Sequence, residues 1–445
     1  MVYRNLYTFA KIFGMRTFDV VVTGGGPAGL MAAGTAASAG RNVLLAEKME
    51  KPARKLRITG KGRCNLTNAR DTARFLEKIR TNREFARAAL RAFSNRDAMD
   101  FFERIGLPLS VERGDRVFPA SGKAWDVAEA LVRWVRKSGA EIRCDTRVRE
   151  IGTLHGRIAS VILEYPNGRT QTVRTSNLII ATGGLSYPAT GSTGDGYDLA
   201  HALGHRIEGI RPALVPLETE SEYVRALKGL HLRNVNVTLL IDGHPVGSEF
   251  GEMEFYEYGL SGPVILRLSR EAVDALIEER KTEVSIDLKP ALSMEKLTAR
   301  IERERPGLPA KATVADLLRK LLPQPLIRPV SRQAGIAPDC PLSRFGYRET
   351  ERLIRTLKDF RLPVTDYRPF TEAIVTAGGV DVSEIDPETL ESKKIGGLYF
   401  AGEVLDLDAD TGGYNLQLAL STGRLAGLLK KSPGAPDFPE PSSAR

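Results

Sequence analysis

Cysteine is scarce in this chain of 445 residues. The three cysteines, Cys64, Cys144 and Cys340, are far apart and odd in number, which argues against a disulfide framework and against a zinc module built on cysteine pairs. The same pattern favours a reducing compartment, so we expect a cytoplasmic protein. Histidine is also rare, and the five histidines show no metal-ligand spacing, so we expect no metal site.

Long apolar runs are missing as well. No run approaches the roughly 18 residues that a membrane-spanning helix needs, so we expect no membrane partner. Hydrophobic residues make up 42% of the chain and charged residues 27%, a composition typical of globular proteins that argues against extensive disorder. The length allows two or three domains with substantial cores.

Positive charge is in excess, with a formal net charge of +9. Such an excess attracts anions, whether small molecules, anionic lipid or nucleic acid. The basic residues are mixed with acidic ones, and no arginine-rich block is longer than a few residues. We therefore expect a small-molecule partner rather than nucleic acid, with an RNA-linked role as the minority alternative. The sequence does not predict the oligomeric state.

The two ends of the chain differ from the rest in composition. Residues 1–17 contain three basic residues and no acidic one, and they lack the apolar core of a secretory signal. We expect a loose extension or an upstream start, with Met15 as the alternative start. Residues 432–445 are rich in proline, and we expect them to be disordered.

The stretch "FDVVVTGGGPAGLMAAGTAASAGRNVLLAEK" begins at Phe18 and predicts a buried strand, a tight turn, a helix of small residues and a second strand. Gly24 permits the turn, Gly26 lets a pyrophosphate approach the backbone, and Gly29 brings helix and strand together. Glu47 follows at the usual distance and can accept hydrogen bonds from ribose hydroxyls. The stretch therefore predicts a dinucleotide site, FAD or NAD rather than NADP, that also includes Pro27, Ala28 and Lys48. The alternative is a purely structural turn.

A later segment, residues 141–184, predicts a small meander of short strands followed by a buried strand that ends in "ATGG". An insertion of this kind is typical of FAD domains of the glutathione-reductase class. We expect Val148 to offer backbone contacts to adenine, and Thr182, Gly183 and Gly184 to border the cofactor. The alternative for these three residues is a simple strand terminator.

A second glycine turn lies near the end of the chain, in "GGLYFAGEVLDLDADTGGYNLQ". A strand over residues 396–401 leads to Gly402 and Glu403, then a loop, then a helix beginning near Gly413 and Tyr414. Extended FAD is too long for one turn, and the amides at this helix start favour the negative charge of a reduced flavin. FAD spanning both turns is therefore our prediction, and a structural helix start is the alternative. The second docking point also includes Asn415 and Leu416.

No second complete G-x-G-x-x-G motif follows a strand after Gly204, and Cys64 has no partner cysteine within a turn. The chain therefore lacks the separate NAD(P)H domain and the dithiol of disulfide reductases. If NADH or NADPH reduces the flavin, we expect it to dock transiently.

Five longer motifs stand out along the chain: Ala53–Asn68, Gly114–Val127, Ala181–Ala200, Gly251–Ser269 and Gly396–Gln417. Together they resemble the BaiN/YhiN-type bacterial flavoproteins, a family of NAD(P)/FAD-dependent oxidoreductases that are aminoacetone-oxidase-like or bile-acid-reductase-like. The similarity runs from Phe18 to Leu429 and implies bound FAD without fixing the substrate.

The first of these motifs contains a loop, "TGKGRCN", whose glycines let the backbone run close to a planar ring. Arg63 offers a fork of donors and Asn65 can bond to ring edges. We place Lys55, Gly62 and Cys64 in the cofactor site with them. The alternatives are a solvated surface turn and a small buried cysteine.

The sequence departs from the family pattern at two places. Family members commonly have S-G-G-G-R-C-N where this loop has an additional cation, Lys61. Members often carry F-T-H or F-T-D where this chain has Phe255-Tyr256-Glu257-Tyr258. If that segment lines the substrate pocket, activities of other members do not transfer directly.

These patterns define the expected architecture as α/β, an FAD-binding Rossmann-like domain with an inserted β-barrel-like and helical domain. The FAD-binding domain comprises residues 18–207 and 363–431, and the insertion comprises residues 208–362. Within the insertion we expect a helix over residues 293–305 and another opened by Thr313 and stopped by Pro323. The family resemblance places a substrate pocket at the domain junction, and Thr376, Gly378 and Gly379 near the flavin.

The leading functional hypothesis is an FAD-dependent oxidoreductase, reduced by NADH or NADPH, that passes hydride to a small conjugated or carbonyl-activated substrate. Oxidation of a small amine by oxygen is the close alternative, and an RNA-associated or non-catalytic flavin protein is the more distant one. No catalytic residue is assigned. Candidates for a proton donor are Tyr187, Glu254, Tyr256 and Tyr258.

Overall fold

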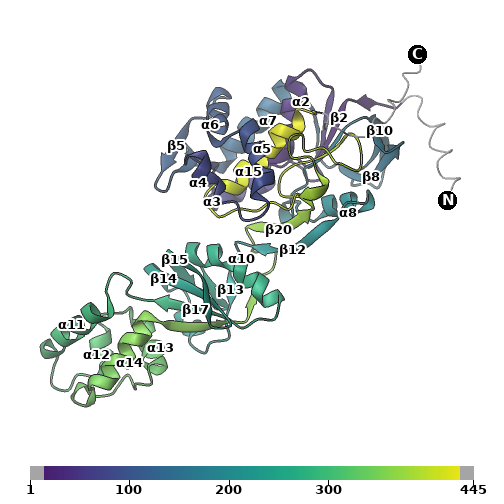
Figure 1. Ribbon diagram of the computed structural model, residues 1–445. Coiled ribbons are helices and arrows are strands. Elements are labelled where there is room, and N and C mark those ends of the chain that lie inside the picture. Colours follow the sequence, from purple (N-terminus) through teal and green to yellow (C-terminus); the bar gives the residue numbers. More distant parts are fainter. Residues whose placement is uncertain (1–14, 431–445) are drawn as a thin grey trace. The chain divides into compact units, whose positions relative to one another are not determined.

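The computed structural model describes residues 15–430, and the expected disordered tail and most of the expected extension lie outside them. The described chain forms two compact units (Figure 1). The first comprises the described residues of Met1–Arg211 and Val375–Arg445, and the second comprises Pro212–Ile374. The expected boundary at residue 362 falls inside strand β18 (Phe360–Val364), which is paired with β17 (Thr282–Asp287) in the second unit.

The first unit is built on a parallel five-stranded sheet. Four of its strands are short, mostly apolar runs that are almost completely buried, as in sheets covered on both faces, whereas the fifth, at one edge, carries two charged residues and is half-buried. The helices α2 (Pro27–Ser38), α7 (Ala124–Lys137) and α15 (Tyr414–Gly427) belong to this layer, and α2 packs against both others. The strand order is β21 (Leu398–Phe400), β11 (Leu178–Ile180), β2 (Val20–Thr23), β3 (Val43–Ala46) and β7 (Glu141–Arg143).

Two smaller sheets and five helices complete the core of the first unit. The predicted meander is confirmed as a four-stranded sheet of β1 (Thr17–Phe18), β10 (Thr170–Thr175), β9 (Arg157–Glu164) and β8 (Arg147–Leu154). A three-stranded sheet joins β4 (Thr67–Asn68), β6 (Arg116–Pro119) and β5 (Leu109–Glu112). The helices are α3 (Arg54–Gly62), α4 (Thr72–Leu76), α5 (Arg83–Ala92), α6 (Asn95–Arg104) and α8 (Asp195–Ala202).

The chain leaves and re-enters the first unit through a two-stranded ribbon. Strand β12 (Ile207–Ala213) is paired with β20 (Val375–Val380). Beyond the ribbon, Ile374 N donates to Leu214 O at 3.2 Å. The two ends of the second unit therefore lie side by side.

The second unit contains a seven-stranded sheet that closes on itself. The sheet begins with β18 and ends with β19 (Asp366–Tyr367), and only Thr365 separates these two strands in the sequence. Thr365 N donates to Glu218 O at 3.1 Å. One continuous segment thus supplies both the first and the last strand of the sheet. The expected barrel-like part of the insertion is therefore confirmed. The other strands are β17, β14 (His231–Ile241), β15 (His244–Phe255), β16 (Gly259–Ser261) and β13 (Leu217–Glu218).

Helices account for the rest of the second unit. The predicted helix after Ser293 is confirmed as α11 (Met294–Glu304), with Leu297 and Ile301 buried. The capping box of Thr313 opens α12 (Val314–Leu318), but this helix ends at Leu318. Proline restricts only the residue before it, so Pro323 does not set this end. The others are α9 (Val224–Leu227), α10 (Pro263–Ile277), α13 (Gln324–Gln333) and α14 (Tyr347–Lys358). None of the helices within residues 15–430 combines the length and apolar character needed to cross a bilayer.

Candidate functional site

The residues expected to hold a cofactor follow the carboxyl ends of neighbouring parallel strands. The first glycine turn follows β2, Glu47 follows β3, Thr182 follows β11 and Gly402 follows β21. Because all four strands run in the same direction, these segments meet at one edge of the sheet. That edge is where ligands bind in open α/β sheets.

The three positions of the first turn differ in whether the structure requires glycine there. Gly24 has φ +99°, and a Cβ there would lie 2.5 Å from Ala181 O. A Cβ at Gly29 would lie 1.9 Å from Gly24 O, so helix and turn require glycine at both positions. At Gly26, by contrast, φ is −73° and a Cβ would meet nothing within 4 Å. Neither strain nor packing within the protein requires Gly26, so its position leaves open space in which a ligand could approach the backbone.

Glu47 is buried and holds the turn from the side. Its Oε2 accepts a hydrogen bond from Gly25 N at 2.6 Å, and its Oε1 accepts one from Met49 N at 2.8 Å. Burial raises the pKa of this carboxyl, and the two backbone donors partly offset the rise. An ionised carboxylate has about four acceptor positions, so it can also accept hydrogen bonds from ribose hydroxyls.

Three buried oxygen atoms near the glycine turns lack partners among the described residues. They are Thr182 Oγ1, Asn65 Oδ1 and Thr67 Oγ1. Thr67 O lies 2.4 Å from the position of a Cβ at Gly413, so this strand end touches the second glycine turn. Buried polar groups are almost always hydrogen-bonded. These atoms, with the open space at Gly26, fit an elongated polar ligand such as FAD.

Lys55 and Glu403 form the central ion pair of the site. Lys55 Nζ lies 2.8 Å from Glu403 Oε2 and donates to Ser186 Oγ at 2.6 Å. Glu403 Oε1 also accepts hydrogen bonds from Ser186 Oγ at 2.8 Å and from Thr376 N at 2.7 Å. Burial alone raises the pKa of Glu403, but Lys55 and these donors together hold that pKa below its usual value. The carboxylate is therefore ionised and fixed by three segments of the chain.

Ser186 and Thr376 complete this network. Thr376 was expected near the flavin from the family resemblance, whereas Ser186 was not assigned to the site. Thr376 Oγ1 accepts hydrogen bonds from Leu185 N at 2.8 Å and Ser186 N at 3.0 Å. Ser186 lies two positions beyond the "ATGG" turn. This proximity is the only sequence signal that could have indicated it.

Lys48 contacts the start of helix α8. Its Nζ lies 3.0 Å from Asp195 Oδ2 and also contacts Thr193 Oγ1. Burial alone raises the pKa of Asp195. Hydrogen bonds from Thr193 and Lys48 lower it by more than this, so the net pKa is below its usual value. Lys48 thus joins the second strand of the dinucleotide motif to α8.

The "TGKGRCN" loop interrupts the end of α3, where Thr59 to Lys61 are not helical. Gly62 has φ +82° and faces open space. The Arg63 guanidinium is paired with Glu112 and lies 4.3 Å above the Phe118 ring. Cys64 is fully buried, and burial raises the pKa of its thiol to about 12. Its thiol therefore remains protonated at neutral pH.

The second glycine turn opens helix α15, as predicted. Gly413 has φ +96° and precedes Tyr414, whose buried ring packs edge-on against Phe75 with 4.8 Å between centroids. The Asn415 side chain accepts from Ala409 N at 2.9 Å and donates to Ala409 O at 2.7 Å. The amide of Asn415 therefore shapes the loop before the helix, and Leu416 is half-buried behind it.

Two further expected contacts lie on neighbouring strands. Val148 is buried on β8, and the pairing of β8 with β9 is irregular immediately after it. Gly183 has φ +76°, and a Cβ at Gly184 would lie 2.4 Å from Thr376 Oγ1. The "ATGG" turn therefore packs directly against the network of Lys55 and Glu403.

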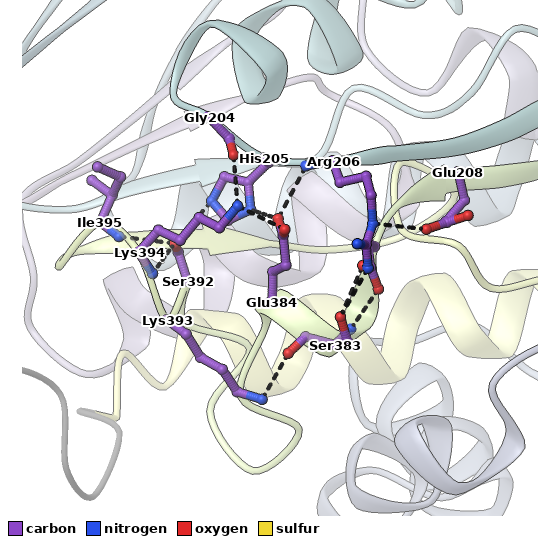
Figure 2. A network of polar contacts seen from close by, with 11 residues as sticks. Gly204, His205, Arg206, Glu208, Ser383, Glu384, Ser392, Lys393, Lys394 and Ile395 are labelled. Carbon is purple, nitrogen blue, oxygen red and sulfur yellow. Dashed lines mark hydrogen bonds and ion pairs between the residues drawn. The ribbon is translucent and has the colours of Figure 1, made fainter.

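A separate polar network anchors the ribbon of β12 and β20 in the first unit (Figure 2). The buried His205 lies between Glu384 Oε2, 3.0 Å from its Nδ1, and Ser392 Oγ, 2.9 Å from its Nε2. Since an ionised carboxylate only accepts, Nδ1 carries the proton and Nε2 accepts from Ser392. Ser392 Oγ in turn accepts from the backbone N–H groups of Lys394 and Ile395. This array fixes the ring as a neutral imidazole.

We expect the stability of the protein to fall as the pH drops below about 6.5, and His205 to cause part of that fall. Burial lowers the pKa of His205 below the unfolded value of 6.5, although Glu384 opposes the shift. The unfolded chain then binds the proton first, so the loss continues down to the folded pKa at up to about 1.4 kcal/mol per pH unit. The measurement is the unfolding free energy against pH.

The matched variants for this measurement are His205→Gln and His201→Gln, the latter at an exposed histidine on α8. His205→Gln should flatten the pH dependence below 6.5, and His201→Gln should leave it nearly unchanged. Parallel curves for the wild type and His205→Gln would remove His205 as the cause.

Comparison with known proteins identifies the family. The HI0933-like protein Rossmann domain matches residues 18–429. The 3-dehydro-bile acid delta(4,6)-reductase of Clostridium scindens is 32% identical over 409 residues, which cover 91% of this chain and 97% of the reductase. The ribosomal RNA dihydrouridine synthase of Escherichia coli is 32% identical over 410 residues, which cover 92% of this chain and 96% of the synthase.

A solved structure supports the fold. The 3-ketosteroid delta1-dehydrogenase from Sterolibacterium denitrificans, in complex with 1,4-androstadiene-3,17-dione, has a TM-score of 0.50 at 14% identity. The match covers 93% of this chain and 99% of the dehydrogenase. The chain belongs to the HI0933-like Rossmann family, as its resemblance to the BaiN/YhiN-type flavoproteins predicted, and it is an FAD-dependent oxidoreductase.

Proposed function

We propose that this enzyme reduces a carbon–carbon double bond conjugated to a carbonyl group, with NADH or NADPH as the transient source of electrons. The supporting observation is that two relatives of equal identity, 32% each, are named for reactions on bonds of this kind. In a 3-dehydro-bile acid the delta-4 bond adjoins a ketone. In uridine the bond that is saturated in dihydrouridine adjoins the C4 carbonyl.

Bound FAD would supply the hydride chemistry. The chain's own contribution is to hold and orient this cofactor. The first turn of α2 would offer a positive helix end and its free backbone N–H groups to the diphosphate, except at Pro27, which has no N–H. The start of α15 at Tyr414 would offer a positive helix end to the electron-rich part of the flavin ring. The Lys55–Glu403 ion pair at the same edge of the sheet is neutral overall, and it would hold the surrounding segments in place around the cofactor.

Two tyrosines in the second unit are candidates for the proton that saturation of such a bond requires. Tyr256 and Tyr258 are stacked, with ring centroids 5.4 Å apart. Tyr256 donates to Glu254 Oε2 at 3.0 Å and Tyr258 donates to Glu372 Oε2 at 3.2 Å. The hydrogen bond to Glu254 raises the pKa of Tyr256, and burial raises that of Tyr258, so both hydroxyls keep their protons at neutral pH. Each could therefore act as an acid.

Tyr187 is a candidate in the first unit. It has a left-handed backbone, φ +55°, and begins the short turn Pro188–Thr190 next to the segment that contains Ser186. A strained residue beside a cofactor site is consistent with a functional role. We rank it with the two stacked tyrosines as a possible proton donor.

The proposal predicts rapid loss of the yellow flavin colour when the purified enzyme is mixed with NADPH or NADH without oxygen. Stopped-flow absorbance measures the rate for each nicotinamide. The proposal also requires that recovery of colour by oxygen be slower than recovery by an enone substrate. A flavin that neither nicotinamide reduces would contradict the proposed reductant, and fast recovery by oxygen with an amine donor would favour the oxidase alternative.

A further inference from the structure

The helical lobe of the second unit, residues 288–359, carries most of the chain's excess positive charge. This segment lies between β17 and β18 and contains α11 to α14 (Figure 1). It has 15 Lys and Arg residues against 8 Asp and Glu residues. Its net charge is therefore +7 in a chain whose total is +9. All other residues together are nearly neutral, so the charge is concentrated rather than spread over the molecule.

Three segments of the lobe meet at one end, as their hydrogen bonds show. Leu342 N donates to Ala312 O at 2.9 Å. Arg305, just after α11, donates to Leu342 O at 3.1 Å and to Phe345 O at 2.8 Å. The end of α11, the loop before α12 and the turn before α14 therefore lie side by side. We call their exposed residues the basic end: Arg303, Lys311, Arg344, Tyr347 and Arg348.

The four cations of the basic end have no ion-pair partner within residues 15–430. The nearby Glu349 is occupied, because it accepts from Gly346 N and pairs with Arg352. Two exposed acids in the neighbourhood, Glu302 and Asp339, do not balance four cations. Single solvated cations are common on protein surfaces, but a cluster of four without partners creates a local positive field.

Tyr347 gives the basic end an exposed aromatic ring. It is 80% exposed and is the first residue of α14, with Arg344 and Arg348 on either side in the sequence. An exposed ring of this kind offers a flat surface on which an unpaired base can stack. A neutral steroid-like substrate would need neither the ring nor the four charges.

We propose that the basic end docks structured RNA, with Arg303, Lys311, Arg344 and Arg348 contacting phosphates and Tyr347 stacking on an unpaired base. This inference rests on the proposed function and deepens it, because it makes a uracil ring in RNA the conjugated substrate. Charge complementarity favours a polyanion, and the exposed ring favours a nucleic acid over an acidic protein. The expectation of a small-molecule partner was based on the charge of the whole chain. It did not take into account that most of the net positive charge lies in residues 288–359.

The test measures binding of a fluorescently labelled, unmodified transcript of bacterial ribosomal RNA to the full-length, FAD-loaded enzyme over a range of KCl concentrations. A variant with Arg303, Lys311, Arg344 and Arg348 all changed to glutamine should bind at least about tenfold more weakly at about 100 mM KCl. Its logarithmic salt slope should be smaller by about 3, since each lost phosphate contact removes about 0.7 to 0.9.

The matched control changes four exposed cations of the first unit, Arg96, Arg133, Lys137 and Arg169, to glutamine. It loses the same net charge and should bind nearly as well as the wild type. Equal weakening in both fourfold variants, or none in the first, would overturn the proposed docking surface. Unfolding temperature and flavin absorbance confirm that each variant is folded.

Tyr347→Ala separates stacking from charge. We expect it to weaken binding by about 5- to 150-fold while leaving the salt slope unchanged, whereas Tyr347→Phe should retain most of the affinity. Unchanged affinity in Tyr347→Ala would overturn the stacking role.

The docking surface and the proposed chemistry can fail separately. RNA retention with the expected salt slope, but no dihydrouridine after addition of NADPH, would support docking and contradict the chemistry on RNA. Reduction of a small enone by an enzyme that does not retain RNA would support the chemistry and overturn the docking surface.

Discussion

The Gly26→Ala variant should be a folded protein that purifies without its yellow colour. The backbone of Gly26 has φ −73°, and an added Cβ meets nothing within 4 Å, so the variant loses about 1 kcal/mol at most, as expected for a changed helix cap. The methyl group would occupy the space where the diphosphate approaches the backbone. Each hydrogen bond to a charged group that is lost costs about 1.5 to 3 kcal/mol, a factor of about 10 to 150 in FAD affinity.

The measurement is the ratio of flavin to protein absorbance after purification, followed by titration with FAD and by thermal unfolding without FAD. Gly29→Ala is the contrasting variant, because its Cβ would lie 1.9 Å from Gly24 O and should prevent correct folding. A Gly26→Ala protein that binds FAD as tightly as the wild type would contradict the assignment of this turn to the diphosphate.

The Lys55→Met variant should be destabilised by about 2 to 4 kcal/mol. This substitution leaves the Glu403 carboxylate in a largely buried position without its cation, and removal of one partner of a buried pair costs about 3 to 5 kcal/mol. We reduce that range by about 1 kcal/mol because about a fifth of each side chain is exposed, 22% for Lys55 and 20% for Glu403. Chemical denaturation of the FAD-free protein at pH 7 measures the effect.

The double variant Lys55→Met/Glu403→Gln should recover much of this loss, since it removes the unpaired charge as well. Lowering the pH gives an independent check. Lys55 and the surrounding donors hold the pKa of Glu403 below 4.5, so its stabilising effect is complete above 4.5 and is lost as the pH falls through the lower, folded pKa. Equal stability of the single and double variants would show that the pair is not coupled.

The part of the site that could be predicted from the sequence is the part whose residues are neighbours along the chain. The turn at Gly24 and Gly26 is local, because strand, turn and helix follow one another without a gap. The start of α15 at Gly413 is local in the same way. In both cases backbone geometry and helix polarity determine which residues face a ligand, and both are readable from spacing.

The central ion pair could not be predicted as a pair, because Lys55 and Glu403 are 348 positions apart. Nothing in the local sequence of either residue identifies its partner, because only the three-dimensional fold brings α3 next to the segment that follows β21. Arg63 is similar. Its local sequence predicts a donor for a planar ring but does not identify its partners in the structure, which are Glu112 and the ring of Phe118.

The limits of the inserted domain were also difficult to predict from the sequence, for a different reason. After the segment around residue 362 the chain returns to the first unit. The alternation of apolar and polar residues in this segment indicates a strand but does not indicate which sheet the strand joins. It pairs with β17 at one end and, through β19, with β13 at the other. Strand pairing between distant segments is decided by three-dimensional contacts, so the boundary at 362 divides a strand that the barrel requires.

The adjacency of the two ends of the second unit has a consequence for the evolution of the chain. Because Leu214 and Ile374 are joined by a hydrogen bond, a whole folded module begins and ends at nearly the same point. Such a module can be inserted, lost or exchanged through a single two-stranded ribbon without opening the parallel sheet. Recombination at that ribbon would give one redox core a succession of different inserted domains, each tested by selection as a unit.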